Sequence, residues 1–310
     1  MDKTLKKTPV VVGVAILCCV LWGSAFPMIK LGYAEFQIPQ DDPASQILFA
    51  GCRFTLAGVL AWIFGSAAAR RPLLPCKHSW GRIAVLSLFQ TILQYLFFYI
   101  GLANCTGVKS SVINGCGAFV CILVSALVFR MERLTAAKLV GCLLGAVGIV
   151  IVNLGGSFGG GFSLIGEGFI VLSVIAYAFS TVLIKRFSAD DEPVMLSSLQ
   201  FVLGGLVMAV CGACFGGRLP VITTGGVFIL LYLGFLSAAA YSLWSLLLKY
   251  NPVSKVAIFS FMTPICGVVL SALFLGEMQQ AFSINALAAL ILVSGGIYIV
   301  NIDGRKKNDS

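Results

Sequence analysis

Polar side chains at helical spacing interrupt several long apolar stretches of this sequence. Gln90 and Gln94 lie four residues apart, so a helix would place both on one face. Tyr241 and Trp244 lie three residues apart in a second stretch. Amide groups and aromatic rings can bind a small polar molecule through hydrogen bonds and ring contacts. These two pairs therefore indicate a binding site rather than a catalytic one.

Other apolar stretches contribute residues of the same types. The predicted substrate-binding residues are Trp22, Gln90, Gln94, Asn114, Tyr177, Tyr241 and Trp244. Gathered between helices, they would form an aromatic-walled pocket that suits a zwitterion, an aromatic compound or an organic cation. The alternative is structural, because amides also hold membrane helices together and aromatic residues gather near lipid headgroups. We favour substrate contact for the two pairs named above, since both lie well inside their stretches.

The composition identifies lipid as the solvent of the helices that carry these residues. Charged residues make up 11% of the 310 residues, hydrophobic residues make up 59%, and the mean hydropathy is +1.01. Soluble domains average about 25% charged residues. The net charge is +9, but the basic residues stand in short groups between apolar stretches. This pattern excludes a soluble enzyme, a nucleic-acid-binding protein and a disordered chain.

The sequence offers no metal site. Its single histidine, His78, lies in a basic loop, and nearly all of its 11 cysteines lie within apolar stretches. Cys211 and Cys214 have a C-x-x-C spacing, but the surrounding LVMAVCGACF favours small apolar side chains over a redox or metal pair. We therefore expect neither a metal nor a cofactor.

Apolar stretches that could each cross a bilayer, which takes about 20 residues, recur along the whole chain. They cover residues 9–31, 45–67, 82–102, 107–129, 136–154, 165–186, 195–215, 226–249, 254–275 and 283–301. The first could instead be a signal peptide, because lysines precede it. If all ten cross, 17 of the 21 basic residues fall on the side of the N-terminus. Basic residues favour the cytoplasmic side, so both termini are predicted there.

The two halves of the chain repeat one another. GIVIVN at 148–153 matches GIYIVN at 296–301, RFTLAG at 53–58 matches QFVLGG at 200–205, and SAL recurs at 125–127 and 271–273. Each half holds an odd number of stretches, so the second half must insert with the opposite orientation. The sequence thus predicts an all-α integral membrane protein with ten transmembrane helices in two inverted five-helix repeats. The expected boundaries are 1–155 for the first repeat, 156–162 for a Gly-rich linker and 163–310 for the second repeat.

Several of these motifs resemble those of a known family. Trp22-Gly23 followed by Phe26, Arg53-Phe54, SALFLGE at 271–277 and GGIYIVN at 295–301 resemble the EamA-type members of the drug/metabolite transporter superfamily. The resemblance covers essentially the whole chain. It implies a ten-helix carrier of small metabolites, which often moves them outward across a bacterial inner membrane. The chain departs from the pattern where Arg130 interrupts SALVFRME and where Ala118 stands opposite Pro264.

These observations predict a secondary transporter in the bacterial cytoplasmic membrane that exports or exchanges amino acids or related amphipathic compounds. Alternatives are a multidrug or organic-cation exporter, a lipid flippase, a membrane enzyme, and a channel or structural membrane protein. The expected partners are a small-molecule substrate and membrane lipid, with no nucleic acid, and the chain would act as a monomer or homodimer. No stretch has an acidic residue near its middle, which favours facilitated diffusion or exchange over proton coupling.

Gating residues are expected as well. Pro27 and Pro264 would each remove a backbone hydrogen bond inside a helix, which makes them candidate hinges or static kinks. Arg53 is the only charged residue clearly inside a stretch. Such a cation is costly unless it snorkels, pairs with an acid or meets a substrate carboxylate or phosphate. We expect an ion pair that latches the outer gate, with a partner among Glu35, Asp41, Asp42, Glu167 and Glu277.

Overall fold

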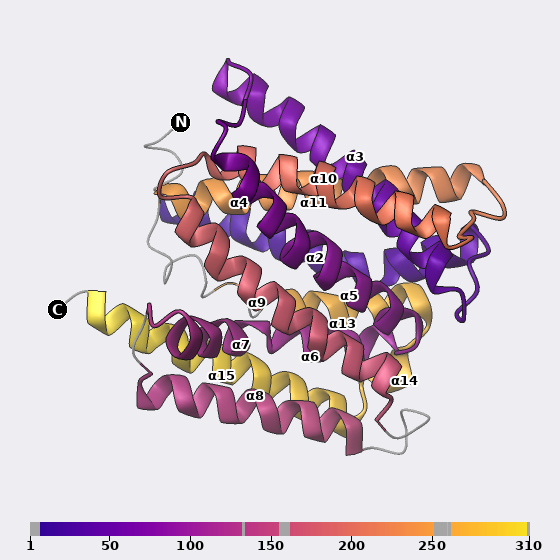
Figure 1. Cartoon of the computed structure of the whole chain (residues 1–310). Coiled ribbons are helices and arrows are strands. Elements are labelled where there is room, and N and C mark those ends of the chain that lie inside the picture. Colours follow the sequence, from indigo (N-terminus) through magenta and orange to yellow (C-terminus); the bar gives the residue numbers. More distant parts are fainter. Residues whose placement is uncertain (1–6, 132–133, 155–161, 251–258, 260–261, 309–310) are drawn as a thin grey trace.

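A computed structural model describes the chain except for residues 1–6, 132–133, 155–161, 251–258, 260–261 and 309–310. The described residues form helices joined by short turns, and no strand occurs among them (Figure 1). The predicted linker at 156–162 lies outside the described residues apart from Phe162.

The first half of the chain forms five helical passages. They are α2 (Thr8–Glu35), α3 (Pro43–Ala69), the continuous series α4 (Ser79–Leu86), η1 (Ser87–Leu93) and α5 (Gln94–Ala103), the series α6 (Gly107–Gly115), α7 (Gly117–Leu123) and η2 (Val124–Val128), and α8 (Ala136–Leu154). Local sequence explains the ends of α3. Asp42 accepts a hydrogen bond from the Ser45 backbone N–H at 3.1 Å, and the helix stops at Arg70, whose φ is 53°.

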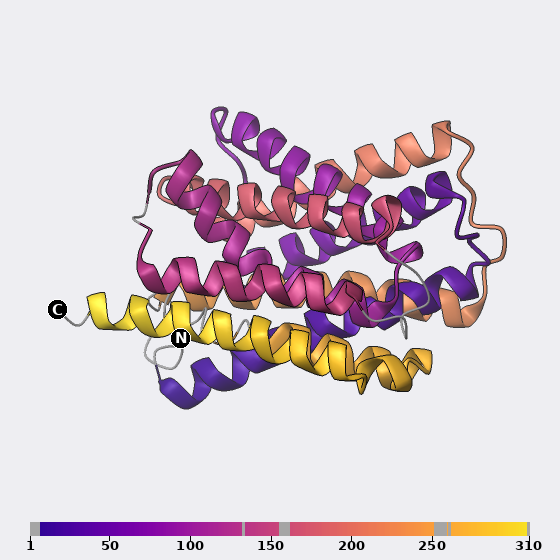
Figure 2. The ribbon, with the colours of Figure 1, turned by 90° about the horizontal axis from the view of Figure 1, so that it is seen from below.

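The second half follows the same order. Its elements are η4 (Leu164–Gly168) with α9 (Phe169–Phe187), α10 (Pro193–Cys214), α11 (Thr224–Tyr250), α13 (Met262–Leu275), the short α14 (Met278–Ala281) and α15 (Ile284–Asn308). The N-terminal end of α2 and the C-terminal end of α15 lie at the same end of the bundle in Figures 1 and 2.

Seven of the described helices are long and apolar enough to cross a membrane. Three further apolar helices, Ala136–Gly148, Met262–Leu275 and Ile284–Ile299, are shorter within the described residues. Large apolar side chains point outward, as expected where lipid is the solvent: Leu143, Phe228 and Ile291 are 66%, 67% and 70% exposed. The protein is therefore a multi-pass α-helical membrane protein.

Helices from the two halves contact one another in matched pairs. Helices at the same place in each half pair directly: α3 with α10, α6 with α13, and α8 with α15, which run side by side in Figures 1 and 2. In addition, α2 packs on α11 as α9 packs on α5, and α2 packs on α13 as α9 packs on α7. Each of these contacts made by a helix of the first half therefore has a counterpart made by the corresponding helix of the second half.

Glycines bring the paired helices into backbone contact. A Cβ on Gly51 of α3 would lie 2.3 Å from the backbone N of Ala209 in α10. In the reverse direction, a Cβ on Gly205 of α10 would lie 2.4 Å from the backbone N of Thr55 in α3. Small residues are the usual means of close approach between membrane helices. They hold α3 firmly against α10 and so fix the position of Arg53.

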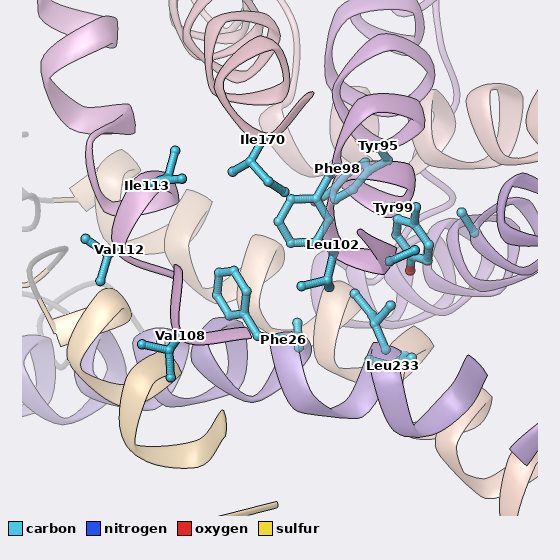
Figure 3. Close-up of a cluster of buried hydrophobic side chains, with 14 of the residues drawn as sticks. Phe26, Tyr95, Phe98, Tyr99, Leu102, Val108, Val112, Ile113, Ile170 and Leu233 are labelled. Carbon is cyan, nitrogen blue, oxygen red and sulfur yellow. The ribbon is translucent and has the colours of Figure 1, made fainter. Parts of the chain in front are cut away.

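The largest buried cluster lies where the halves meet. Figure 3 labels ten of its side chains, which come from α2, α5, α6, α9 and α11: Phe26, Tyr95, Phe98, Tyr99, Leu102, Val108, Val112, Ile113, Ile170 and Leu233. These side chains come from both halves, and Tyr99, Leu102 and Leu233 are fully buried. The cluster joins the halves into one body and supports the polar groups described next.

Candidate functional site

Arg53 projects from α3 into the centre of the protein and is 3% exposed. Its Nη1 donates to the Tyr99 hydroxyl at 2.7 Å, its Nη2 to the Ser237 hydroxyl at 2.9 Å, and its Nε to the Leu233 carbonyl at 3.3 Å. Its guanidinium carbon also lies 4.9 Å from the centre of the Phe54 ring. All of these groups are neutral.

The expected acidic partner of Arg53 is therefore wrong for this conformation. Three of the candidate acids are engaged elsewhere: Glu167 pairs with Lys109, Glu277 accepts from backbone N–H groups of α6, and Glu35 accepts from the Thr223 hydroxyl. The helix begins at Pro43, so Arg53 lies about 15 Å along it.

Aromatic rings from four helices meet at the next turn of α11. Tyr241 exchanges a 2.9 Å hydrogen bond with Tyr95, and its ring lies 5.6 Å from that of Trp22 and 4.9 Å from that of Phe201. Trp22 in turn lies 5.0 Å from Trp244. The edge-on ring contacts join α2, α10 and α11, and the hydrogen bond from Tyr95 adds α5. The structure thus brings the predicted residues Trp22, Tyr241 and Trp244 together.

Three polar atoms in this region are buried without a hydrogen-bond partner. They are Nε1 of Trp22, Oε1 of Gln90 and Oε1 of Gln94. Gln90 lies in the π-helical segment η1, beside Tyr241, and Gln94 begins α5. π-Helical turns are frequent at functional sites. A buried donor and two buried acceptors left unpaired are costly, so they are suited to receive a ligand.

The remaining predicted residues take different places. The hydroxyl of Tyr177, in α9, lies close enough to those of Tyr95 and Tyr241 to interact with them electrostatically. The edge of the Tyr177 ring also faces Gly117. Asn114 lies at the end of α6 and makes no hydrogen bond to the cluster in the described chain. We define the central cluster as Trp22, Gln90, Gln94, Tyr95, Tyr177, Tyr241 and Trp244.

The two prolines expected to act in gating differ in position. Pro27 lies inside α2, as predicted. The described part of α13 begins at Met262, and Pro264 is its third residue. Its carbonyl accepts from the Ser111 hydroxyl at 3.1 Å, which ties α13 to α6.

Sequence reasoning missed an ion pair between the halves at one end of the bundle. Nζ of Lys109, in α6, lies 2.7 Å from Oε1 of Glu167, in η4, and both side chains are 4% exposed. Glu277 accepts from the backbone N–H groups of Gly107 and Val108 at 3.1 and 3.0 Å, which places its charge at the N-terminus of α6.

A second connection between the halves lies at the opposite end. Arg82 of α4 donates to Asp190 and Asp191, at 2.7 Å each, and Ser79 donates to Asp191 at 2.6 Å. Burial raises the pKa of the Asp191 carboxyl, but the hydrogen bonds from Ser79 and Arg82 outweigh it and hold that pKa below its ordinary value.

Comparison of the sequence with known protein families agrees with the arrangement of helices described above. The EamA-like transporter family matches the chain twice, over residues 10–154 and 164–302. This chain belongs to the EamA-like transporter family. The resemblance inferred from its motifs is therefore confirmed.

Relatives of this EamA-like protein carry transporter names. It is 27% identical over 309 residues to "Uncharacterized transporter YvbV" of Bacillus subtilis, which covers 96% of this chain and 93% of the relative. It is 26% identical over 296 residues to a "Probable amino-acid metabolite efflux pump" of Salmonella typhimurium, which covers 92% of both chains. A protein of the same description from Escherichia coli is 24% identical over 296 residues.

A solved structure described as "Crystal structure of protein" has a similar fold. Its TM-score is 0.67 at 18% identity, and the match covers 96% of this chain and 98% of the other. The family and the names of the relatives indicate that this EamA-like protein is a transporter rather than an enzyme.

Proposed function

We propose that this EamA-like protein is a secondary carrier that exports or exchanges amino acids or related amphipathic metabolites across the cytoplasmic membrane. The observation that carries the proposal is the central cluster. It combines aromatic rings from both halves with the unpaired donor of Trp22 and the unpaired acceptors of Gln90 and Gln94. A zwitterion has both a charged donor group and a charged acceptor group, and its side chain would lie against the rings.

The relatives support this substrate class. Two of them, from Salmonella typhimurium and Escherichia coli, are described as probable amino-acid metabolite efflux pumps. The proposed membrane arrangement has ten spans in two inverted repeats, with both termini cytoplasmic. It is supported by the matched contacts between halves and by the two separate family matches. Carriers built in this way bind their substrate between the repeats.

Transport by purified protein tests the function. Proteoliposomes that contain the wild type should exchange a labelled amino acid from a panel of neutral L-amino acids, and protein-free liposomes should not. Gln94→Ala, Tyr241→Ala and Trp244→Ala should each reduce the exchange rate by about tenfold or more, because each removes a contact to a desolvated ligand.

Matched controls separate this result from general damage to the protein. Trp80 and Tyr298 are 53% and 51% exposed, so Trp80→Ala and Tyr298→Ala should transport at the wild-type rate. Wild-type exchange by all three cluster variants would contradict the proposed site. A fluorescent protein fused after Ser310 should fluoresce in a bacterial host, and activity of a periplasm-only reporter at that position would contradict the proposed topology.

A further inference from the structure

The charge of Arg53 has no counter-ion in the described chain. The ion pairs seen within 4.0 Å among the described residues join His78, Arg82 and Lys109 with Asp190, Asp191 and Glu167, and none of them includes Arg53. Arg53 is nevertheless 3% exposed and lies about 15 Å along α3 from Pro43. An arginine keeps its charge in any protein environment, so the positive charge at this depth stays unbalanced.

The groups around this charge are donors with unused hydrogens. A guanidinium has five N–H groups, of which three are used here. One N–H therefore remains on each of Nη1 and Nη2. Tyr99 and Ser237 accept from Arg53, and the described chain shows no acceptor for their own hydroxyl hydrogens. Together these atoms offer four donors around one positive charge, which is the chemistry of an anion site.

This donor group adjoins the central cluster. Ser237 and Tyr241 are one turn apart on α11, and Tyr99 and Tyr95 are one turn apart on α5 (Figure 3 shows both tyrosines). The charge of Arg53 also lies close enough to the hydroxyls of Tyr95 and Tyr241 to interact with them electrostatically. Gln90 lies next to Tyr241, and the buried Oε1 atoms of Gln90 and of Gln94, four residues further along, have no hydrogen-bond partner.

We propose that Arg53 determines substrate specificity by binding the carboxylate of the transported molecule, together with the hydroxyl groups of Tyr99 and Ser237. This inference rests on the proposed function and adds a requirement to it. The substrate must carry a carboxylate, whose negative charge balances Arg53 during transport. An ammonium group of the same molecule would donate to Gln90 and Gln94. Organic cations without a carboxylate are repelled by Arg53 and are not substrates.

Carboxylate is the anion that this geometry favours. A guanidinium and a carboxylate are both planar and can form two parallel hydrogen bonds, and each of the terminal nitrogens of Arg53 retains one N–H for this purpose. The second half of the chain provides a natural comparison. Gln200 stands at the position that corresponds to Arg53 in the repeat, and its Oε1 accepts from Thr91. The buried guanidinium is therefore supplied by the first half alone, although Ser237 of the second half completes the group of donors.

Ligand-induced thermal stabilisation tests the site without requiring transport. The probes are four compounds of one shape: L-leucine, 4-methylpentanoate, 4-methylpentanamide and isopentylamine. The melting temperature of the purified wild type in detergent should rise with the two carboxylates and stay unchanged with the amide and the amine. Arg53→Gln, which copies the residue of the second half, should weaken carboxylate binding by about tenfold to a hundredfold. Arg53→Lys should retain part of it.

Several outcomes would overturn the proposal. They are equal stabilisation of the wild type by acid and amide, no carboxylate-specific stabilisation at any concentration, and an unchanged carboxylate response in Arg53→Gln. The baseline melting temperature and elution profile of each variant report its folding, and Arg53→Lys tests the site should Arg53→Gln fail to fold. Arg218 is exposed, so Arg218→Gln is the control for general loss of positive charge.

Transport measured on the same samples separates the two proposals. Leucine exchange that is inhibited by 4-methylpentanoate and not by the amide supports both. Exchange that the amide inhibits equally well would overturn the role of Arg53 and leave the proposed function in place. A carboxylate-specific rise in melting temperature without transport of any amino acid would support carboxylate binding by Arg53 and overturn the proposed function.

Discussion

At one end of the bundle, Lys109 and Glu167 meet at 2.7 Å with both side chains 4% exposed. At the other end, Arg82 meets Asp190 and Asp191 at the same distance. Asp191 is only 5% exposed, but Arg82 is 25% exposed and Asp190 is 62% exposed. The residues from Ser79 to Ala103 form one passage of 25 residues between these ends, a length of about 37 Å. Ion pairs therefore join the two halves at both ends, but water reaches Arg82 and Asp190 and is excluded from Lys109 and Glu167.

The difference decides what each pair contributes. Removal of one partner from a desolvated pair leaves a buried charge without a counter-ion, which is strongly destabilising. Removal of one partner from a hydrated pair lets water and salt take its place. A carrier that alternates its access must separate the halves at one end at a time. We therefore expect the Lys109 end to resist opening more strongly than the Arg82 end.

The Lys109 end is also tied by a helix terminus. Glu277 accepts from the backbone N–H groups of Gly107 and Val108, the two residues directly before Lys109, so two carboxylates from the second half anchor one short helix of the first half. At the Arg82 end, the contacts to Asp191 come from the start of α4, through Ser79 and Arg82, and from the neighbouring His78 at 3.8 Å.

The largest effect is expected from Lys109→Met. It leaves Glu167 buried and unpaired, and the free energy of unfolding should fall by about 3–5 kcal/mol. The fall would appear as a lower melting temperature and a lower yield of monodisperse protein. Because the penalty comes from the remaining charge, the double variant Lys109→Met with Glu167→Gln should recover most of the loss. A single variant that melts like the wild type would show that the two ends do not differ as described.

A smaller effect is expected from Glu277→Gln. The amide keeps one acceptor oxygen for the N-terminus of α6 but loses the charge that interacts with the helix dipole, so the expected loss is about 1–2 kcal/mol. Chemical denaturation in detergent measures it. Gln279→Ala, a change at an exposed neighbour, is the matched control and should leave stability unchanged. An equal loss of stability in Glu277→Gln and Gln279→Ala would show that the charge of Glu277 does not stabilise the Lys109 end.

The sequence predicted the helical fold and the aromatic group because both depend on local pattern. Apolar stretches of bilayer length and the repeat of motifs indicate the helices directly. Trp22, Tyr241 and Trp244 stand out as aromatic residues inside such stretches, and the structure brings their rings together. Their contacts follow from helical spacing and from the pairing of the two halves.

The ion pairs and the partners of Arg53 depend on distances between helices, which spacing does not contain. Lys109 is one of the four basic residues that the sequence does not assign to the side of the N-terminus, and Glu167 is an acid at the start of an apolar stretch. Nothing in the sequence indicates that these two residues pair. Arg53 illustrates the same point. Charge arithmetic favours an acid as its partner, whereas packing places the neutral hydroxyls of Tyr99 and Ser237 there. The Arg82 end was partly predictable, since the loop charges place Arg82 and Asp191 on one side.

Salt should distinguish the two ends. In Arg82→Gln, the contacts to Asp190 and Asp191 are lost, and the melting temperature should fall less than in Lys109→Met. The difference between Arg82→Gln and the wild type should shrink as the salt concentration rises, because exposed charges are screened. The loss in Lys109→Met should stay nearly constant over the same range. Equal salt dependence in both variants would contradict the contrast in solvent.

The smallest effect concerns the pH dependence of Asp191. The pKa of this carboxyl is held below its ordinary value of 3.8, with burial opposing the shift and the donors Ser79 and Arg82 outweighing it. A carboxyl whose pKa is lower in the folded protein stabilises the fold above its unfolded pKa, and this contribution is lost as the pH falls through the folded value. The difference in melting temperature between the wild type and Asp191→Asn should therefore stay constant from neutral pH to the ordinary aspartate range. It should disappear only at lower pH.

The exposed Asp41, changed to Asn, is the matched control and should show little difference at any pH. A difference that already vanishes well above 3.8 would mean that Arg82 and Ser79 do not hold the ionised form of Asp191.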